Sequence, residues 1–247
     1  MSIYLNLKGM RQTMRVRKMK NSDERFSRAG EGLLTDDPLR DLPLRKNAPD
    51  RMLCAEIGCG KGKFIAGTAA SSPERDFIAL EKISDVITLA MERFKEDGSA
   101  LPENLRFVCA DVSELQKLLP PGSLDVIYLN FSDPWPKARH EKRRLTYHEY
   151  LGLYRSLLRE GGKVIMKTDN RGLFDYSLES FASNGWEVSE LTFDLHHSEW
   201  NEGNITTEYE DNFSGKGFPT CRGVFSPVGA VGADAPEPRI TSLGIRP

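Results

Sequence analysis

Residues 53–64 read LCAEIGCGKGKF, the strongest indication of fold class in this chain. Five largely apolar residues, the length of a buried strand, are followed by glycines at 58, 60 and 62. Residues 64–70 then have the composition of a helix. A strand, a glycine-rich turn and a helix in this order are typical of an α/β unit that holds a ligand at the turn. Because glycine has no Cβ atom, the backbone there can turn tightly and approach a ligand closely.

The same alternation of short apolar runs and helical spacing continues downstream. Further strands are predicted at 77–80, 105–109, 124–129, 163–167, 186–195 and 220–225, and helices at 85–96, 112–119, 147–158 and 173–181. Strands that alternate with helices predict an α/β fold: a doubly wound, mostly parallel Rossmann-like sheet with helices on both faces. Continuous apolar strands fit a sheet that is covered on both sides.

Composition divides the chain into three parts. Residues 1–50 are polar and broken by glycines and prolines, which predicts a basic N-terminal arm and linker rather than a core. Residues 51–225 form the predicted domain. Residues 226–247 are rich in proline, glycine and alanine, so a flexible C-terminal tail is expected. The basic stretch at 11–20 is either an arm that grips phosphates or a solvated face.

Charge and hydropathy limit the partners. The 247 residues carry a formal net charge of −2 and are 39% hydrophobic. No apolar run is long enough to span a bilayer and the N-terminus does not resemble a signal peptide, so a cytoplasmic protein without a membrane partner is expected. The four cysteines show no CxxC spacing, and His196 and His197 are expected on a strand with their rings on opposite faces. No metal is therefore predicted.

The glycine spacing distinguishes between cofactors. A dinucleotide fingerprint needs GxGxxG, but its last position falls on Lys63. The chain instead has Gly58, Gly60 and Gly62, preceded by Glu56. A diphosphate at the helix N-terminus would be repelled by this carboxylate. A cationic ligand would suit it, which favours S-adenosylmethionine, with its ammonium and sulfonium groups.

Two further acids follow the next two predicted strands. Glu81 is placed to accept hydrogen bonds from ribose hydroxyls, and Asp111 could face the adenine amino group. A single acid at a strand end is commonplace. Three acids after three consecutive strands fit a ligand in the crevice at the carboxyl ends of a parallel sheet.

Residues 131–144, FSDPWPKARHEKRR, carry the second group of chemically suggestive residues. An acid, a flat aromatic and rigid prolines follow the strand at 124–129 and could form a pocket for a planar group. The cations beside them, which suit phosphates, are Lys137, Arg139, Lys142, Arg143 and Arg144. The combination indicates chemistry on a nucleic-acid base. The alternatives are that Trp135 simply packs and that the cations are a solvated face.

These motifs resemble known families. EIGCGKGKF at 56–64, the Glu81 position and CADVSEL at 109–115 resemble class I S-adenosylmethionine-dependent methyltransferases. The stretch from 131 to 145 more narrowly resembles the bacterial tRNA (guanine-N7-)-methyltransferases. Three later segments agree: KTDN at 167–170, TEYE at 207–210 and FSGKGFPTCR at 213–222. The resemblance covers about residues 14–225, so Met14 is a candidate start, residues 1–13 an upstream extension, and the tail unexplained.

The resemblance implies roles by position. It implies contacts to the cofactor or the reacting centre at Glu56, Glu81, Asp111 and Asp133. It implies substrate binding at Lys137, Asp169, Thr207, Glu208, Tyr209 and Glu210. It implies RNA contacts at Arg139, His140, Glu141, Lys142, Arg143 and Arg144. A guanosine of the tRNA variable loop as target is implied in the same way. The partner is then tRNA, and the protein a monomer or homodimer.

The chemistry predicts how some of these residues act. Guanine N7 carries an in-plane lone pair, so alignment with the methyl donor matters more than removal of a proton. Asp133 is the predicted catalytic carboxylate, because the purine gains positive charge as the methyl group arrives. Asp169 and Glu210 could accept hydrogen bonds from guanine. Alternatively, Asp169 caps a helix, and Glu208 and Glu210 share the solvated edge of an extended segment.

Three other functions compete with this prediction. An amino-group methyltransferase carries an Asp/Asn-Pro-Pro-aromatic motif, whereas here Trp135 precedes the second proline. A non-catalytic RNA-binding module on the same fold would not need the acids. A dehydrogenase is disfavoured by the glycine spacing.

Overall fold

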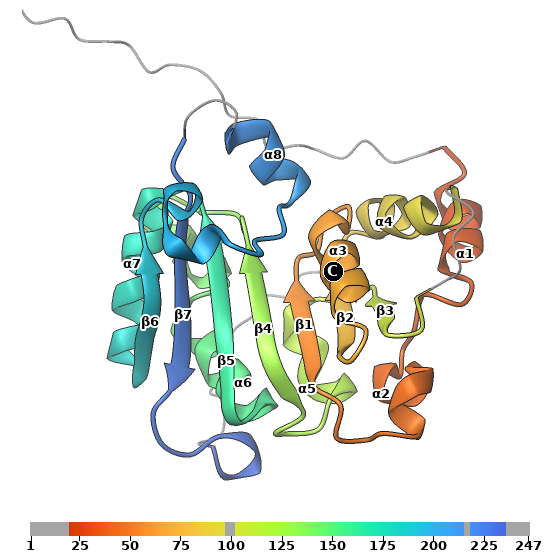
Figure 1. The fold of residues 1–247 in the computed structure, drawn as a ribbon, viewed down its shortest axis with the longest axis horizontal. Helices are drawn as coiled ribbons and strands as arrows, with labels where there is room; N and C mark the ends of the chain where they lie inside the picture. The colour runs from red at the N-terminus through yellow and green to blue at the C-terminus, as the bar shows by residue number, and fades with distance from the viewer. Residues whose placement is uncertain (1–19, 97–101, 215–217, 236–247) are drawn as a thin grey trace, which may run out of the picture.

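The predicted sheet is present in the computed structural model, which describes residues 20–96, 102–214 and 218–235. Within these residues seven strands form one sheet in the order β3-β2-β1-β4-β5-β7-β6 (Figure 1). They are β1 (Leu53–Ile57), β2 (Asp76–Leu80), β3 (Leu105–Val108), β4 (Leu124–Asn130), β5 (Leu158–Thr168), β6 (Trp186–Thr192) and β7 (Cys221–Pro227). Strands β1 to β5 pair in parallel, and β7 is antiparallel to β5 and β6. The prediction of a mostly parallel α/β sheet is confirmed.

Helices cover both faces of the sheet, as predicted. They are α3 (Lys63–Ser71), α4 (Ser84–Glu96), α5 (Leu115–Leu118), α6 (His148–Leu157) and α7 (Arg171–Ser183). Side chains of β1 alternate between the two faces, as in any strand. Ala55 and Ile57 join a core cluster with residues of α6 and α7, whereas Cys54 joins the cluster formed with α3 and α4. Nearly every β1 position is therefore apolar, because its side chains pack in the core on both faces of the sheet.

Residues 20–50 differ from the expected linker outside the core. They form α1 (Ser22–Gly30), α2 (Pro38–Asp41) and a 3-10 helix at Pro43–Lys46. Leu33 and Leu42 are fully buried, and the Phe107 backbone N–H donates to the Leu33 carbonyl. Few apolar residues are enough to bury this segment, because they pack against the edge of the sheet formed by the rest of the chain. The predicted domain boundary at residue 51 stays a prediction, and the basic stretch at 11–20 lies outside the described residues except for Lys20.

The start of the predicted C-terminal tail is structured. Ser226 pairs with Glu187 of β6, so the last strand runs beyond the expected boundary. Arg155 of α6 then donates hydrogen bonds to the carbonyls of Val228 and Ala230. Hydrogen bonds to the backbone hold Val228 and Ala230, and composition does not reveal contacts of this kind. Residues 236–247 lie outside the description.

The histidine pair lies on a short 3-10 helix, Leu195–His197, and not on a strand. Strand β6 ends at Thr192, whose hydroxyl accepts a hydrogen bond from the Asp194 backbone N–H and closes a turn.

The described ranges contain no helix with the length and apolar character needed to cross a bilayer.

Candidate active site

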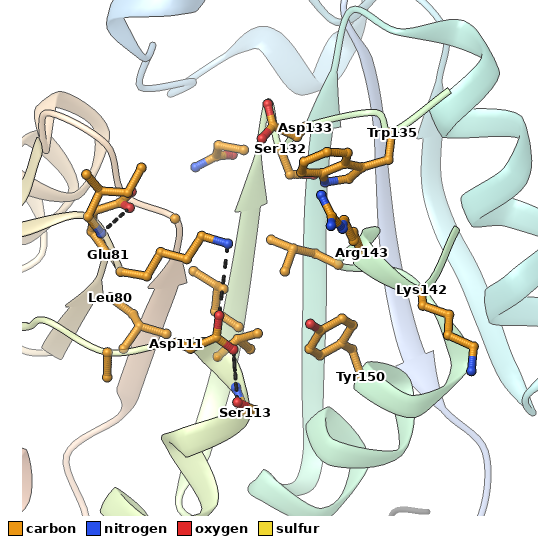
Figure 2. A pocket seen from close by; sticks show the side chains of 18 of the residues that line it. Leu80, Glu81, Asp111, Ser113, Ser132, Asp133, Trp135, Lys142, Arg143 and Tyr150 are labelled. Carbon is orange, nitrogen blue, oxygen red and sulfur yellow. Dashed lines mark hydrogen bonds and ion pairs between the residues drawn. The ribbon is translucent and has the colours of Figure 1, made fainter. Parts of the chain in front are cut away.

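A cavity of about 630 Å³ opens at the carboxyl ends of the parallel strands. It lies where the strand order reverses between β1 and β4, the usual ligand site of an open α/β sheet. In Figure 2, Glu81 and Asp111 lie on one side, and Trp135, Arg143 and Tyr150 on the other. Glu81, Asp111 and Asp133 therefore line one cavity together with Arg139, Lys142 and Arg143, whereas Glu56, Lys137 and Arg144 are not among its lining residues.

The glycine-rich turn forms part of the cavity rim. Gly58 and Gly60 have φ of +76° and +57°, a region that favours glycine, and a Cβ atom on either would meet nothing within 4 Å. The backbone there is open to a ligand. Gly62 differs, since its Cβ would lie 3.1 Å from the Ala90 Cβ of α4. Two of the three glycines thus give access, and the third permits close helix packing.

Glu81 and Asp111 are held by local hydrogen bonds. The Glu81 carboxylate accepts from the backbone N–H groups of Gly60 (3.3 Å) and Ile83 (3.0 Å). Asp111 caps a 3-10 helix by accepting from the backbone N–H and hydroxyl of Ser113. Lys82 approaches its other oxygen to 4.0 Å. Both acids line the cavity and also fix the loops that form its wall.

Glu56 lies beneath this rim and is almost fully buried. Asn130 Nδ2 donates to Glu56 Oε1 over 2.8 Å, whereas Oε2 is buried without a donor among the described residues. Burial raises the pKa of Glu56 to about 8, despite the opposing effects of the Asn130 hydrogen bond and the Lys167 charge. A buried carboxyl oxygen without a partner would readily accept from a cationic ligand. Sequence reasoning missed Asn130, although it ends β4 directly before the 131–144 stretch.

Asp133 lies in a loop with strained backbone. Phe131 and Trp135, on either side of it, have φ of +48° and +42°. Such values cost of order 1–3 kcal/mol for residues other than glycine and cluster at functional sites. Asp133 is exposed and lines the cavity. The Phe131 backbone N–H donates to the Lys167 carbonyl (2.8 Å), which anchors the start of the loop to β5.

The basic segment lies on a 3-10 helix, Ala138–Arg143, that follows this loop and begins after Lys137. Arg139, Lys142 and Arg143 line the cavity, and the Arg143 guanidinium lies 4.8 Å from the Trp135 ring centroid. His140 makes an edge contact with the same ring. The Trp135 side chain is thus packed against a cation and half-buried, while base stacking stays a prediction.

Two residues of the predicted RNA-contacting segment, whose RNA contacts stay a prediction, also make contacts within the protein. Arg144 donates to the carbonyls of Pro134 and Trp135, and its guanidinium lies 4.1 Å from the Tyr176 ring centroid. Burial and, to a smaller extent, the charge and hydrogen bond of Glu141 raise the pKa of Tyr176 of α7 to about 12. Tyr176 is distant from both residues in the sequence, so no local pattern could predict their contacts with it.

The 207–210 segment is helical, which excludes the extended conformation considered above. It opens α8 (Glu208–Ser214), which lies beyond the ends of β4 and β5 in Figure 1. Thr207 Oγ1 accepts from the Glu210 N–H, and the Glu210 carboxylate approaches the Thr207 N–H at 3.3 Å. This reciprocal pattern is a capping box. T-x-x-E was the signal that could have identified it from sequence.

The two glutamates of this segment have different surroundings. Glu208 pairs with Arg93 of α4, and both side chains are partly exposed. Glu210 is buried, and its carboxylate binds Lys167 Nζ (2.8 Å) and Asn204 Nδ2 (2.9 Å). The idea of a shared solvated edge is therefore wrong. The predicted role of Glu210 towards guanine stays a prediction, but here its oxygens serve a buried ion pair.

Asp169 is not a helix cap, because the adjacent Asn170 caps α7 by accepting from the Leu173 N–H. Asp169 instead accepts a hydrogen bond from the Tyr209 hydroxyl (2.9 Å). The Tyr209 ring also lies 5.1 Å from the Phe131 ring. A partly buried carboxylate and two aromatic rings thus gather beside the loop that carries Asp133.

The described ranges contain no cluster of His, Cys, Asp and Glu suited to hold a metal ion.

Comparison of structures defines the class. An antibiotic-related methyltransferase superposes with a TM-score of 0.57 at 13% identity, covering 79% of this chain and 95% of that one. The 16S rRNA methyltransferase KamB gives 0.53 at 13% identity, covering 87% and 97%. Identities this low show the fold alone. A family model described as "Putative methyltransferase" matches residues 50–222. The chain is thus a Rossmann-like methyltransferase.

Sequence relatives define the family. The tRNA (guanine-N(7)-)-methyltransferase of Lachnoclostridium phytofermentans is 49% identical, over 68% of this chain and 77% of that protein. The enzyme of the same name from Limosilactobacillus reuteri is 43% identical, over 83% and 96%. That of Bacillus subtilis is 44% identical, over 70% and 79%. The chain belongs to the tRNA (guanine-N7-)-methyltransferase family, which confirms the resemblance seen in the motifs.

Proposed function

We propose that this protein transfers a methyl group from S-adenosylmethionine to N7 of a guanosine in tRNA. One observation carries the proposal beyond family membership. Gly58, Glu81, Asp111 and Asp133 share a cavity with Arg139, Lys142 and Arg143. A cationic cofactor and a polyanionic substrate can therefore meet at one place.

The residues present fit S-adenosylmethionine. The unpartnered Glu56 Oε2 and the open backbone at Gly58 and Gly60 suit its cationic amino-acid end. Glu81 would accept from the ribose hydroxyls and Asp111 from the adenine amino group, in place of the long contact with Lys82. When bound, the cofactor supplies an electrophilic methyl group on a sulfonium.

Asp133 is the proposed catalytic carboxylate and a contact of the cofactor site. Guanine N7 needs no deprotonation, so the protein's task is to orient its lone pair towards the methyl carbon. The purine becomes more positive as the bond forms. A carboxylate fixed beside it stabilises the transition state more than the ground state. The strained backbone on both sides of Asp133 is consistent with a side chain held in a defined position.

The substrate side is built from the basic segment and from α8. Lys137, Arg139, Lys142 and Arg143 would bind the RNA backbone, which positions the substrate without reading its sequence. Asp169 and the 207–210 segment beside it would accept hydrogen bonds from the guanine edge. Tyr209 and Phe131 would pack beside the base. A guanosine of the variable loop is the proposed target on family grounds. Reaching N7 requires local unstacking of that nucleotide, at a cost of about a few kcal/mol.

A methylation assay tests the proposal. Unmodified tRNA transcripts are incubated with the protein and labelled S-adenosylmethionine, and digested nucleosides are separated and the modified position mapped. N7-methylguanosine is the expected product. An exocyclic methylamine on adenine or cytosine would identify an amino-group methyltransferase instead. Binding of tRNA without methyl transfer would overturn the proposal and support a non-catalytic RNA-binding module.

A further inference from the structure

The loop that carries Asp133 has an unusual need for support. Residues with positive φ precede and follow Asp133, at Phe131 and Trp135, so the loop is not in a relaxed conformation. The hydrogen bond from the Phe131 N–H to Lys167 anchors only its beginning. A second anchor is needed after Asp133 if the carboxylate is to stay beside the cavity.

Arg144 supplies that anchor. Its Nε and Nη2 each donate over 3.2 Å, to the carbonyls of Pro134 and Trp135 respectively. These are the two residues that directly follow Asp133. A guanidinium is suited to this, because its donors lie in one rigid plane and can bind two neighbouring acceptors together.

Arg144 is itself held by α7. Its guanidinium stacks on the Tyr176 ring at 4.1 Å, and Glu141 bonds to the hydroxyl of the same tyrosine. Arg144 is half-buried, whereas its neighbour Arg143 is exposed and lines the cavity. Two of its three guanidinium nitrogens donate to protein carbonyls, which leaves fewer donors for a phosphate.

We infer that Arg144 is a positioning residue that fixes the Asp133 loop against α7, and not one of the phosphate contacts of the basic segment. This inference rests on the proposed function, because its effect is measured as methyl transfer. Arg144 acts through the loop backbone. Its loss should therefore lower kcat by misplacing Asp133, and should spare the salt-dependent part of tRNA binding.

Arg144→Lys and Arg144→Ala provide the first test. Lysine keeps the positive charge but cannot form a bidentate, stacked contact. Both variants should lose about 10- to 100-fold in kcat, as expected when a reacting group moves by about 1 Å. The slope of log Kd for tRNA against log salt should stay unchanged in both. Full activity of Arg144→Lys, or a slope reduced by about 0.7–0.9 in Arg144→Ala, would overturn the inference.

Arg139→Ala is the matched control. Arg139 is exposed, lies five residues earlier and lines the cavity. Its removal should reduce the salt slope by about 0.7–0.9, as the loss of one phosphate contact does. If Arg139→Ala lowers the salt slope of tRNA binding and Arg144→Ala does not, Arg139 contacts phosphate and Arg144 positions the loop.

Tyr176→Leu tests the same anchor without changing a charge. The variant removes the ring on which Arg144 stacks, so kcat should fall at least threefold with an unchanged salt slope. Unchanged kcat would contradict the inference. Titration of each variant with S-adenosylhomocysteine shows that the cofactor site is intact. If the unsubstituted protein itself transfers no methyl group, the proposed function fails; if it is active but these variants match it, only the anchor role fails.

Discussion

Lys167 Nζ lies 2.8 Å from Glu210 Oε2, and the exposed fractions of the two side chains are only 3% and 0%. Lys167 is the penultimate residue of β5, two residues before Asp169, and Glu210 belongs to the first turn of α8. The pair therefore connects the sheet to the helix that contributes Tyr209. Removing one partner leaves a buried charge without compensation.

Glu210→Ala should lower the free energy of unfolding by about 3–5 kcal/mol, because Lys167 then stays buried and unpaired. Urea denaturation followed by circular dichroism measures the change. Glu208→Ala is the matched control, since the Glu208 pair with Arg93 is partly exposed and should contribute only about 0–1 kcal/mol. Equal losses in the two variants would contradict the structural role given to Glu210.

Glu56 predicts a dependence of stability on pH. Its pKa is raised from 4.5 to about 8 by burial, so between these values the folded protein binds more protons than the unfolded chain. Its contribution to stability is present below pH 4.5 and is lost as the pH rises towards 8, at up to about 1.4 kcal/mol per pH unit. Glu56→Gln should flatten this part of the profile in denaturant titrations at several pH values. An unchanged profile would show that Glu56 ionises normally.

Cofactor binding should release a proton from Glu56. A cationic ligand favours the carboxylate, so affinity for S-adenosylmethionine should rise with pH up to about 8, by at most about tenfold per unit. Calorimetry in two buffers of different ionisation enthalpy measures the proton release directly. Glu56→Gln should abolish the release. Identical heats in both buffers for the unsubstituted protein would rule out this linkage.

Asp133→Asn should lower kcat by about 100- to 1,000-fold, the usual effect of losing one group that stabilises transition-state charge. Asp133 is exposed, and no hydrogen bond within the described residues depends on it, so the melting temperature should stay within a degree or so of the original. Single-turnover kinetics at saturating tRNA separates chemistry from binding. Undiminished single-turnover rates would transfer the catalytic role to another group.

Arg143→Ala should reduce the salt slope of tRNA binding by about 0.7–0.9, because an exposed guanidinium at the cavity would lose one phosphate contact. Filter binding or fluorescence anisotropy from low to moderate salt gives the slope. Arg143→Lys serves as the control, since it keeps the charge. Equal salt slopes for the unsubstituted protein and both variants would show that Arg143 only packs against Trp135.

The fold was predictable because its signals are local. The turn at Gly58 and Gly60 and the apolar runs of the strands define their elements without reference to distant residues. The insertion of β7 between β5 and β6 was not predictable, because pairing across a long connection leaves no local pattern. The buried Leu33 was missed because the short pair Leu33-Leu34 in a polar segment gives no periodicity.

The candidate site was predicted in its composition but not in its detailed contacts. Motif order placed Glu81, Asp111 and Asp133 at one end of the sheet, where the structure has them. What the sequence could not show is which polar groups bind one another. Arg144 looked like one more cation until its donors were seen on the Asp133 loop, and Glu210 looked solvated until its partner Lys167 was located.

The contact of Arg155 with residues 228 and 230 has a practical consequence for handling the protein. Gly232 packs against Gly122, which lies just before the start of β4 and so at the end of the sheet opposite the cavity. A fluorophore or surface linker attached directly after Ala235 would therefore leave the tRNA approach unobstructed.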